Sequence, residues 1–267
     1  MPDAAAVRGA CARALKRSLP VLIGLCAVAG VATAGWFGYQ WLLTSDRFDI
    51  EAIDVRGTRT LDAEHVRLIA GVSVGDNVFR LDLSDVERAI EADPWVATAS
   101  VERELPDRLI IDVVERTPAA VVDLGGLYLA DAEGLVFKRV AVERGEGAGL
   151  PVVTGLDRSD YIEDANAARA AIRRALSIAR TYSGGGERPV LGEVHLDARA
   201  GVTLTTYETA LALRLGRTGD DQLSERLAAF DAAWSALDED ERDAARIVFM
   251  DNEINPDRIT VRFGGKN

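Results

Sequence analysis

The pattern of apolar and polar residues divides the chain into an apolar N-terminal stretch and a long region of short alternating segments. No charged residue occurs from Ser18 to Ser45. The apolar part of this stretch, from Val21 to about Leu43, exceeds the ~20 residues that a helix needs to cross the core of a bilayer. The pattern therefore predicts a transmembrane helix over residues 20–43.

The charges that flank this stretch predict its orientation. Four basic residues and one acidic residue precede it: Arg8, Arg13, Lys16, Arg17 and Asp3. Basic flanks stay in the cytoplasm. Residues 1–19 are therefore predicted to form a cytoplasmic tail, and the chain from residue 46 onward is predicted to lie outside the inner membrane, in a single-pass type II arrangement with a periplasmic C-terminus.

A cleaved signal peptide is the alternative interpretation of the same segment. Ala32-Thr33-Ala34 has the small-x-small form of a cleavage site, which would leave Gly35 as the first residue of the mature chain. However, the apolar core of a signal peptide spans only about 7–15 residues, and this run continues past the site to Leu43. The sequence favours an uncleaved helix.

The segments that follow predict a first folded unit over residues 46–117 with the order strand, helix, helix, strand, strand. The expected elements are a strand at 50–55, a helix at 62–70, a helix that opens with a capping box at 84–87, and strands at 96–103 and 108–115. Leu109, Ile111 and Val113 form an apolar face with a period of two. The two helices are the only local elements available to cover it.

A second unit is expected over residues 118–263, with residues 264–267 as a short tail. Its short alternating segments predict strands at 120–123, 127–130, 134–137, 191–196, 202–207, 210–215, 246–251 and 259–263. Apolar residues three and four apart predict helices at 162–182 and 222–237. The predicted fold class is therefore α+β, with a mostly antiparallel β domain and flanking helices.

Charge and cysteine content narrow the possible functions. The net charge is −12, and the residues after Ser45 contain 27 basic and 42 acidic side chains. A region this acidic is a poor binder of nucleic acids. Both cysteines, Cys11 and Cys26, lie in the first 45 residues, so no disulfide is expected beyond them.

The residue patterns predict neither a cofactor nor a metal site. The two histidines, His65 and His195, have no partners at metal-ligand spacing, and no nucleophile elbow or phosphate-binding loop occurs. We therefore expect no enzyme activity and no small-molecule substrate. A wall hydrolase with paired carboxylates remains as an alternative, because 42 acidic residues make chance pairs common; carboxylates with shifted pKa values in a cleft would support it.

Several short motifs in the first unit occur in a characteristic order. They are Val55-Arg56-Gly57, Gly75-Asp76-Asn77-Val78-Phe79, Pro94-Trp95-Val96, Leu105-Pro106-Asp107 and Val114-Glu115-Arg116-Thr117-Pro118. This set, behind one membrane anchor, resembles the POTRA domain of the FtsQ/DivIB family of bacterial cell-division proteins. The second unit is also similar to that family in its Asp131–Gly134 turn, in Leu150–Leu156 and in Leu215-Gly216-Arg217.

The resemblance implies a non-enzymatic scaffold of the divisome at the division septum. The implied partners are the FtsB and FtsL coiled-coil proteins and, through them, the septal peptidoglycan synthase. A POTRA-bearing secretion component that binds client strands is the alternative. Such proteins usually precede a membrane β-barrel, and no set of strands after residue 118 is long enough to form one.

The resemblance also implies two interaction sites. The first is a recruitment edge on the second POTRA strand, around Thr98, Val101 and Arg103. An ordinary edge guarded by charged residues, here Glu102 and Arg103, is the alternative.

The second implied site is the end of the β domain, where the partner would add a strand to the last segment. Ile259, Val261 and Phe263 alternate with Thr260 and Arg262, which predicts a strand with one buried face. The resemblance assigns partner contacts to Arg199, Ile254, Thr260, Arg262 and Phe263. The family tends to have Asp-Leu-Arg-Tyr where this chain has Asp251-Asn252-Glu253-Ile254. A strand that only completes the core is therefore the alternative.

Overall fold

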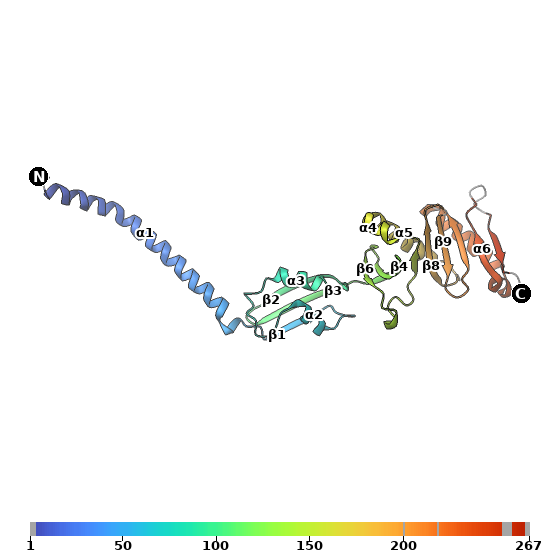
Figure 1. Cartoon of the computed structure of the whole chain (residues 1–267), viewed down its shortest axis with the longest axis horizontal. Coiled ribbons are helices and arrows are strands. Elements are labelled where there is room, and N and C mark those ends of the chain that lie inside the picture. The colour runs from blue at the N-terminus through green and yellow to red at the C-terminus, as the bar shows by residue number, and fades with distance from the viewer. Residues whose placement is uncertain (1–3, 200, 218, 253–257, 265–267) are drawn as a thin grey trace. The chain divides into compact units, whose positions relative to one another are not determined.

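The structure is a computed structural model that describes residues 4–199, 201–217, 219–252 and 258–264, with side chains described from residue 23 onward except at 220 and 221. The chain divides into two compact units, Met1–Glu115 and Arg116–Asn267. Figure 1 shows a long N-terminal helix, a small sheet with two helices and a larger sheet in chain order.

The first unit begins with a single helix, α1 (Ala4–Thr44), and a short 3-10 turn, η1 (Asp46–Phe48). The described residues contain no helix that is long and apolar enough to cross a membrane. Residues 1–3 of the predicted tail lie outside the described residues, and so do the side chains of residues 4–22. The helix is thus present over the predicted span, and its role in a membrane stays a prediction.

The rest of the first unit has the predicted order of elements: β1 (Ala52–Arg56), α2 (Ala63–Ala70), α3 (Leu83–Glu91), β2 (Val96–Glu104) and β3 (Arg108–Glu115). The sheet order is β1-β3-β2. Strand β3 pairs in parallel with β1 and antiparallel with β2. Leu109, Ile111 and Val113 are buried together with Val66 and Ile90 from the two helices, so the predicted apolar face is confirmed.

Helix α2 is capped at both ends, whereas the cap that we predicted for α3 is wrong. Asp62 caps α2 by accepting from the Glu64 amide, and Gly71 ends the helix with φ of +65°, a conformation that favours glycine. The cap of α3 is Asp82, whose carboxylate accepts from the amides of Ser84 and Asp85. An aspartate two residues earlier thus takes the position that we assigned to Ser84.

The second unit is built on one nine-stranded sheet. Its strands are β4 (Pro118–Asp123), β5 (Leu127–Asp131), β6 (Val136–Arg139), β7 (Val152–Thr154), β8 (Leu191–Asp197), β9 (Gly201–Thr206), β10 (Ala212–Gly216), β11 (Ala245–Phe249) and β12 (Thr260–Phe263). Their order is β12-β11-β10-β9-β8-β7-β4-β5-β6. Five neighbouring pairs are antiparallel and three are parallel, which confirms a mostly antiparallel sheet.

Helices cover one face of this sheet. The helices of the unit are α4 (Arg158–Glu163), α5 (Ala165–Ser183), α6 (Asp220–Ala236) and α7 (Glu239–Ala244), with a 3-10 turn η2 (Val142–Arg144). Ile172 of α5 and Phe230 of α6 share one core with Val153, Val194 and Leu213 of the sheet. Cross-strand pairing places these three strand residues on the same face of the sheet. Helices α5 and α6 therefore pack on that face.

The acidic run at residues 238–241 begins the short helix α7, which we did not predict. The Asp238 side chain accepts from the Glu241 amide, and the Glu241 side chain accepts from the Asp238 amide in return. This reciprocal capping box gives the run a structural role.

Candidate partner-binding surfaces

Strand β12 lies at one end of the nine-stranded sheet, with β11 as its only strand neighbour among the described residues. The two strands are antiparallel, with Thr260 opposite Phe249 and Arg262 opposite Ile247. A strand with one neighbour presents a row of unpaired backbone groups on its other side. The predicted terminal edge strand is therefore present.

The two faces of β12 differ as predicted, with one exception. Ile259 and Val261 pack against the large core, whereas Thr260 and Arg262 are exposed. Phe263, which we expected on the buried face, is 44% exposed. The β11–β12 ladder is irregular between Ala245 and Ile247, and such a shift turns the following side chains out of the regular alternation.

An arginine–aromatic cluster lies beside this edge. The guanidinium groups of Arg214 and Arg262 each lie 5.7 Å from the centre of the Phe249 ring, a distance at which cation–π attraction operates. Arg214 also lies 3.8 Å from Asp251. Sequence reasoning missed Phe249, although its alternation with Val248 indicates a residue on the opposite face from the core.

Arg199 lies in the turn between β8 and β9, and β9 is three strands away from β12 in the sheet order. The Arg199 carbonyl accepts a hydrogen bond from Arg217 Nε at 3.1 Å, and Arg217 directly follows β10. Because β10 and β11 run parallel and β12 runs antiparallel to β11, Arg199 shares the side of the sheet on which β11 ends and β12 begins, but it does not lie on a strand next to β12. Ile254, the remaining predicted contact, lies outside the described residues.

The second candidate surface is the β2 edge of the small sheet. Strand β2 is at an edge, as the sheet order shows, but its three predicted residues differ in role. Thr98 is exposed, whereas Val101 is buried in the core of the unit. Arg103 donates to the carbonyls of Val78 and Leu81 at 2.8 and 2.6 Å. Only Thr98 is therefore free to contact a partner without a change in the fold.

Glutamates of α3 occupy the outer side of β2. Glu91 accepts from the Ala99 amide at 3.1 Å, and Glu87 accepts from the Val101 amide at 2.9 Å. The alternative interpretation of this edge assigned its protection to Glu102 and Arg103, and we had assigned Glu87 to a capping box. The structure instead assigns the guarding role to two residues one turn apart on the adjacent helix.

Carboxylates also hold the backbone elsewhere in the molecule. Burial alone would raise the pKa of Glu115, but hydrogen bonds from the amides of Arg59, Leu61 and Thr60 outweigh this effect and lower the pKa. In the second unit, the hydrogen bond from Lys138 lowers the pKa of Glu146.

Each histidine ring lies within hydrogen-bond distance of one polar side chain. His65 Nε2 lies 2.9 Å from Asp93 in the turn after α3, and His195 Nδ1 lies 2.8 Å from the Thr154 hydroxyl. Within the described ranges, no cluster of three or more His, Cys, Asp or Glu side chains is placed to hold a metal ion. The geometry around these residues therefore suits packing and backbone capping.

Two family descriptions match the chain. The POTRA domain of FtsQ type covers residues 48–116, and the C-terminal domain of cell division protein FtsQ/DivIB covers residues 119–251. A relative named cell division protein FtsQ from Anaeromyxobacter sp. (strain K) is 36% identical over 96% of this chain and 84% of its own length. The chain belongs to the FtsQ/DivIB family.

Other FtsQ relatives match to a similar extent. The protein from Myxococcus fulvus is also 36% identical, over 96% of this chain and 88% of its own length. The protein from Streptomyces bingchenggensis is 32% identical over 82% of this chain and 80% of its own length. The FtsQ/DivIB match ends at residue 251, so strand β12 follows the matched region.

Proposed function

We propose that this chain is a non-enzymatic scaffold of the divisome that joins other division proteins outside the inner membrane. The family relationship supports a role in cell division. The observation that supports a binding role is the exposed edge of β12, because an edge strand can accept a further strand from a partner.

The proposal includes a membrane anchor of type II topology at the division septum. Residues 1–19 would remain in the cytoplasm, residues 20–43 would span the inner membrane, and both folded units would lie in the periplasm. The supporting observation is a charge-free run behind four basic residues. N-terminal sequencing of the membrane-bound protein should give residues from the tail; a chain that begins at Gly35 would contradict the anchor.

The proposed partners at β12 are the FtsB and FtsL coiled-coil proteins, with a strand of the partner added alongside β12. Backbone hydrogen bonds would supply much of the affinity, and side chains on the exposed face would supply specificity. The exposed side chains of Thr260, Arg262 and Phe263 support this assignment, and the Arg262–Phe249 contact holds one of them in place.

The double variant Thr260→Glu, Arg262→Glu tests the assignment in the full-length protein. We expect co-purification of the organism's FtsB- and FtsL-type proteins to be lost. The unfolding free energy should fall by no more than about 1 kcal/mol, the size of one exposed cation–π contact.

Arg139→Glu is the matched control, because it reverses one exposed charge on β6 at the opposite end of the same sheet. It should bind partners as the unmodified protein does. Normal partner binding by the β12 double variant would refute the proposed site, and equal loss in both variants would indicate a general charge effect.

A further inference from the structure

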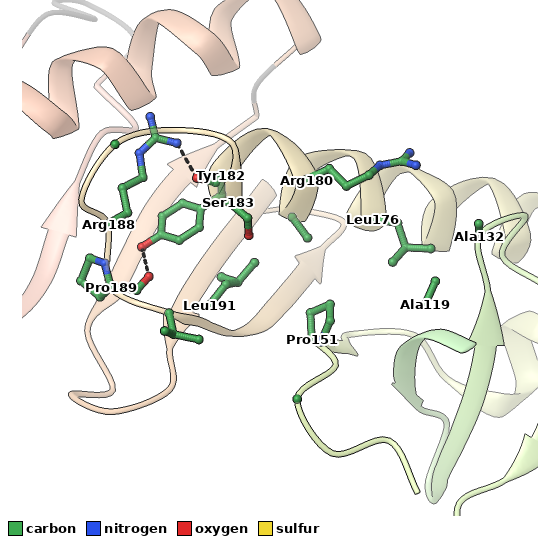
Figure 2. A pocket seen from close by; sticks show the side chains of 14 residues that line it. Ala119, Ala132, Pro151, Leu176, Arg180, Tyr182, Ser183, Arg188, Pro189 and Leu191 are labelled. Atoms are coloured by element: carbon green, nitrogen blue, oxygen red, sulfur yellow. Dashed lines mark hydrogen bonds between the residues drawn. The ribbon is translucent and has the colours of Figure 1, made fainter. Parts of the chain in front are cut away.

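A cavity of about 430 Å³ lies in the second unit, between the last turns of α5 and the beginnings of β4, β7 and β8 (Figure 2). These three strands are parallel neighbours, so their N-terminal ends meet beside the helix. The volume is in the range of about 300–1,000 Å³ that is typical of sites for small ligands.

Apolar side chains form the walls of this cavity. The apolar lining includes Leu176 and Ala179 of α5 and Ala119, Pro151 and Leu191 from the segments where β4, β7 and β8 begin. Figure 2 shows Leu176 beside Ala119 and Pro151, with Leu191 further along the cavity. None of its described lining residues is acidic, although the chain contains 43 acidic residues and only 31 lysines and arginines. The cavity therefore suits the apolar part of a ligand and lacks the negative charge of the rest of the molecule.

Two arginines line the cavity, and they differ in their partners. Arg188 donates to both carboxylate oxygens of Asp231 at 2.6 and 2.7 Å, which neutralises its charge. Arg180 is exposed at the rim, and no described acidic group lies within ion-pair distance of it. Ser183 follows on the next turn of α5 and also lines the cavity. The rim therefore carries an available positive charge at Arg180, and the Ser183 hydroxyl lies at a separate point of the lining (Figure 2).

The tyrosine beside the rim adds no opposing charge. Burial raises the pKa of Tyr182 to about 12, and its hydroxyl donates to the Pro189 carbonyl at 2.9 Å. The phenol is therefore neutral at physiological pH, and it adds no negative charge next to the Arg180 guanidinium.

The backbone around the cavity favours an acyl chain over a peptide. The carbonyls of Pro151 and Val190 accept from the amides of Val121 and Tyr207, and the Pro189 carbonyl is used by Tyr182. Proline has no amide to donate. A peptide here would lose hydrogen bonds to water without replacement, which is costly, whereas an acyl chain has no polar groups to satisfy.

We propose that this cavity binds an anionic amphiphile with a single acyl chain. The chain would lie along Leu176, Pro151 and Leu191, and its carboxylate or phosphate would bind the exposed guanidinium of Arg180. The proposal concerns a second site, distant in the sheet order from β12, and it does not depend on the division role.

Photocrosslinking tests the proposal in the full-length protein held in phosphatidylcholine nanodiscs. The probe is hexadecanoic acid that carries a diazirine on its chain, and the corresponding amine is the cationic comparison. We expect adducts in the peptides that contain the last turns of α5 and residues 186–191, at about tenfold higher yield with the acid, as for one charge-assisted contact. A lysophosphatidylglycerol probe then distinguishes a phosphate head from a carboxylate.

Two variants and two matched controls sharpen the test. Arg180→Glu should lower the adduct yield about tenfold, and Ser183→Trp should block the rim. Arg158→Glu and Ser159→Trp make the same changes at exposed positions of α4 that do not line the cavity, and both should label normally.

The proposal would be overturned by equal labelling with acid and amine, by unchanged labelling of Arg180→Glu, or by adducts confined to other parts of the chain. Circular dichroism of each variant separates a loss of binding from a loss of fold. A synthetic peptide that displaced the probe from the cavity would also contradict an acyl-chain site.

Discussion

The edge strands β2 and β12 have the same position in their sheets and different surroundings. At β2, the carboxylates of Glu91 and Glu87 accept from the outward amides of Ala99 and Val101. At β12, no described side chain is hydrogen-bonded to the backbone of residues 260–263. An edge therefore becomes available for strand addition only when nothing within the fold already satisfies its backbone groups.

Strand β6, at the other edge of the large sheet, resembles β2 more than β12. The Val136 amide of this strand donates to the hydroxyl of Tyr161 at 3.2 Å. Natural sheets protect their edges against unwanted pairing in such ways. The contrast between β12 and the protected edges β2 and β6 supports the proposal that a partner binds at β12.

The largest fall in unfolding free energy is expected when both α3 glutamates that bind the β2 amides are removed. The double variant Glu87→Ala, Glu91→Ala leaves two strand amides without acceptors, and each charged hydrogen bond contributes about 1.5–3 kcal/mol. We expect a clear fall in the unfolding free energy by chemical denaturation and new self-association by analytical ultracentrifugation.

Glu102→Ala is the control for this prediction, because Glu102 is exposed on β2 and caps no described amide. A monomeric, fully stable double variant would show that the two glutamates do not guard the edge. Septal localisation of the same variant would then show whether recruitment uses β2.

The second-largest fall in unfolding free energy is expected at Glu115. This position tests whether hydrogen bonds from carboxylates to backbone amides stabilise the fold or only block strand edges. Glu115 accepts from three amides of the β1–α2 connection and lies at the end of the central strand β3. Glu115→Gln should lower the unfolding free energy by about 1–2 kcal/mol, because a neutral amide forms weaker hydrogen bonds than a carboxylate. Self-association should not increase.

The pH dependence provides a second measurement of the Glu115 contribution. Its pKa in the folded protein is lowered from 4.5, so its stabilising contribution is fully present above about pH 4.5 and is lost as the pH falls through the folded pKa. The difference in unfolding free energy between the unmodified protein and Glu115→Gln should shrink on acidification. A constant difference would contradict the capping role.

A smaller fall in unfolding free energy is expected when the hydrogen bond at the β6 edge is removed. Tyr161→Phe removes the acceptor for the Val136 amide and should cost about 1 kcal/mol, measured by thermal unfolding. Hydrogen exchange at Val136 should accelerate while exchange at the buried Val153 remains slow. Unchanged exchange at Val136 would show that this edge resembles β12 rather than β2.

The smallest effect on stability is expected at Phe249. Phe249→Leu removes both cation–π contacts and should change the unfolding free energy by about 1 kcal/mol or less. Partner binding should weaken more than stability, because Arg262 loses the ring that positions it. Equal binding by this variant would restrict the partner surface to the backbone of β12.

The sequence predicted most of the elements because their signals are local. The alternation of Leu109, Ile111 and Val113 depends on spacing within one strand, and the structure confirms the buried face that it predicts. The α3 cap was misplaced because Ser84 and Asp82 are both good capping residues. The exposure of Phe263 could not be predicted, since it follows from an irregularity in pairing with β11.

The sequence by itself determined the order of elements, the buried strand faces and the charge distribution, because these depend on side-chain chemistry at fixed spacing. Only the tertiary structure decided which strand edges are guarded. Glu87 and Val101 lie on different elements, 14 residues apart in the sequence, and they meet only because α3 packs along β2. The same holds for Arg262 and Phe249, and for Arg180 and Pro151, because long-range packing of the chain brings each pair to one surface.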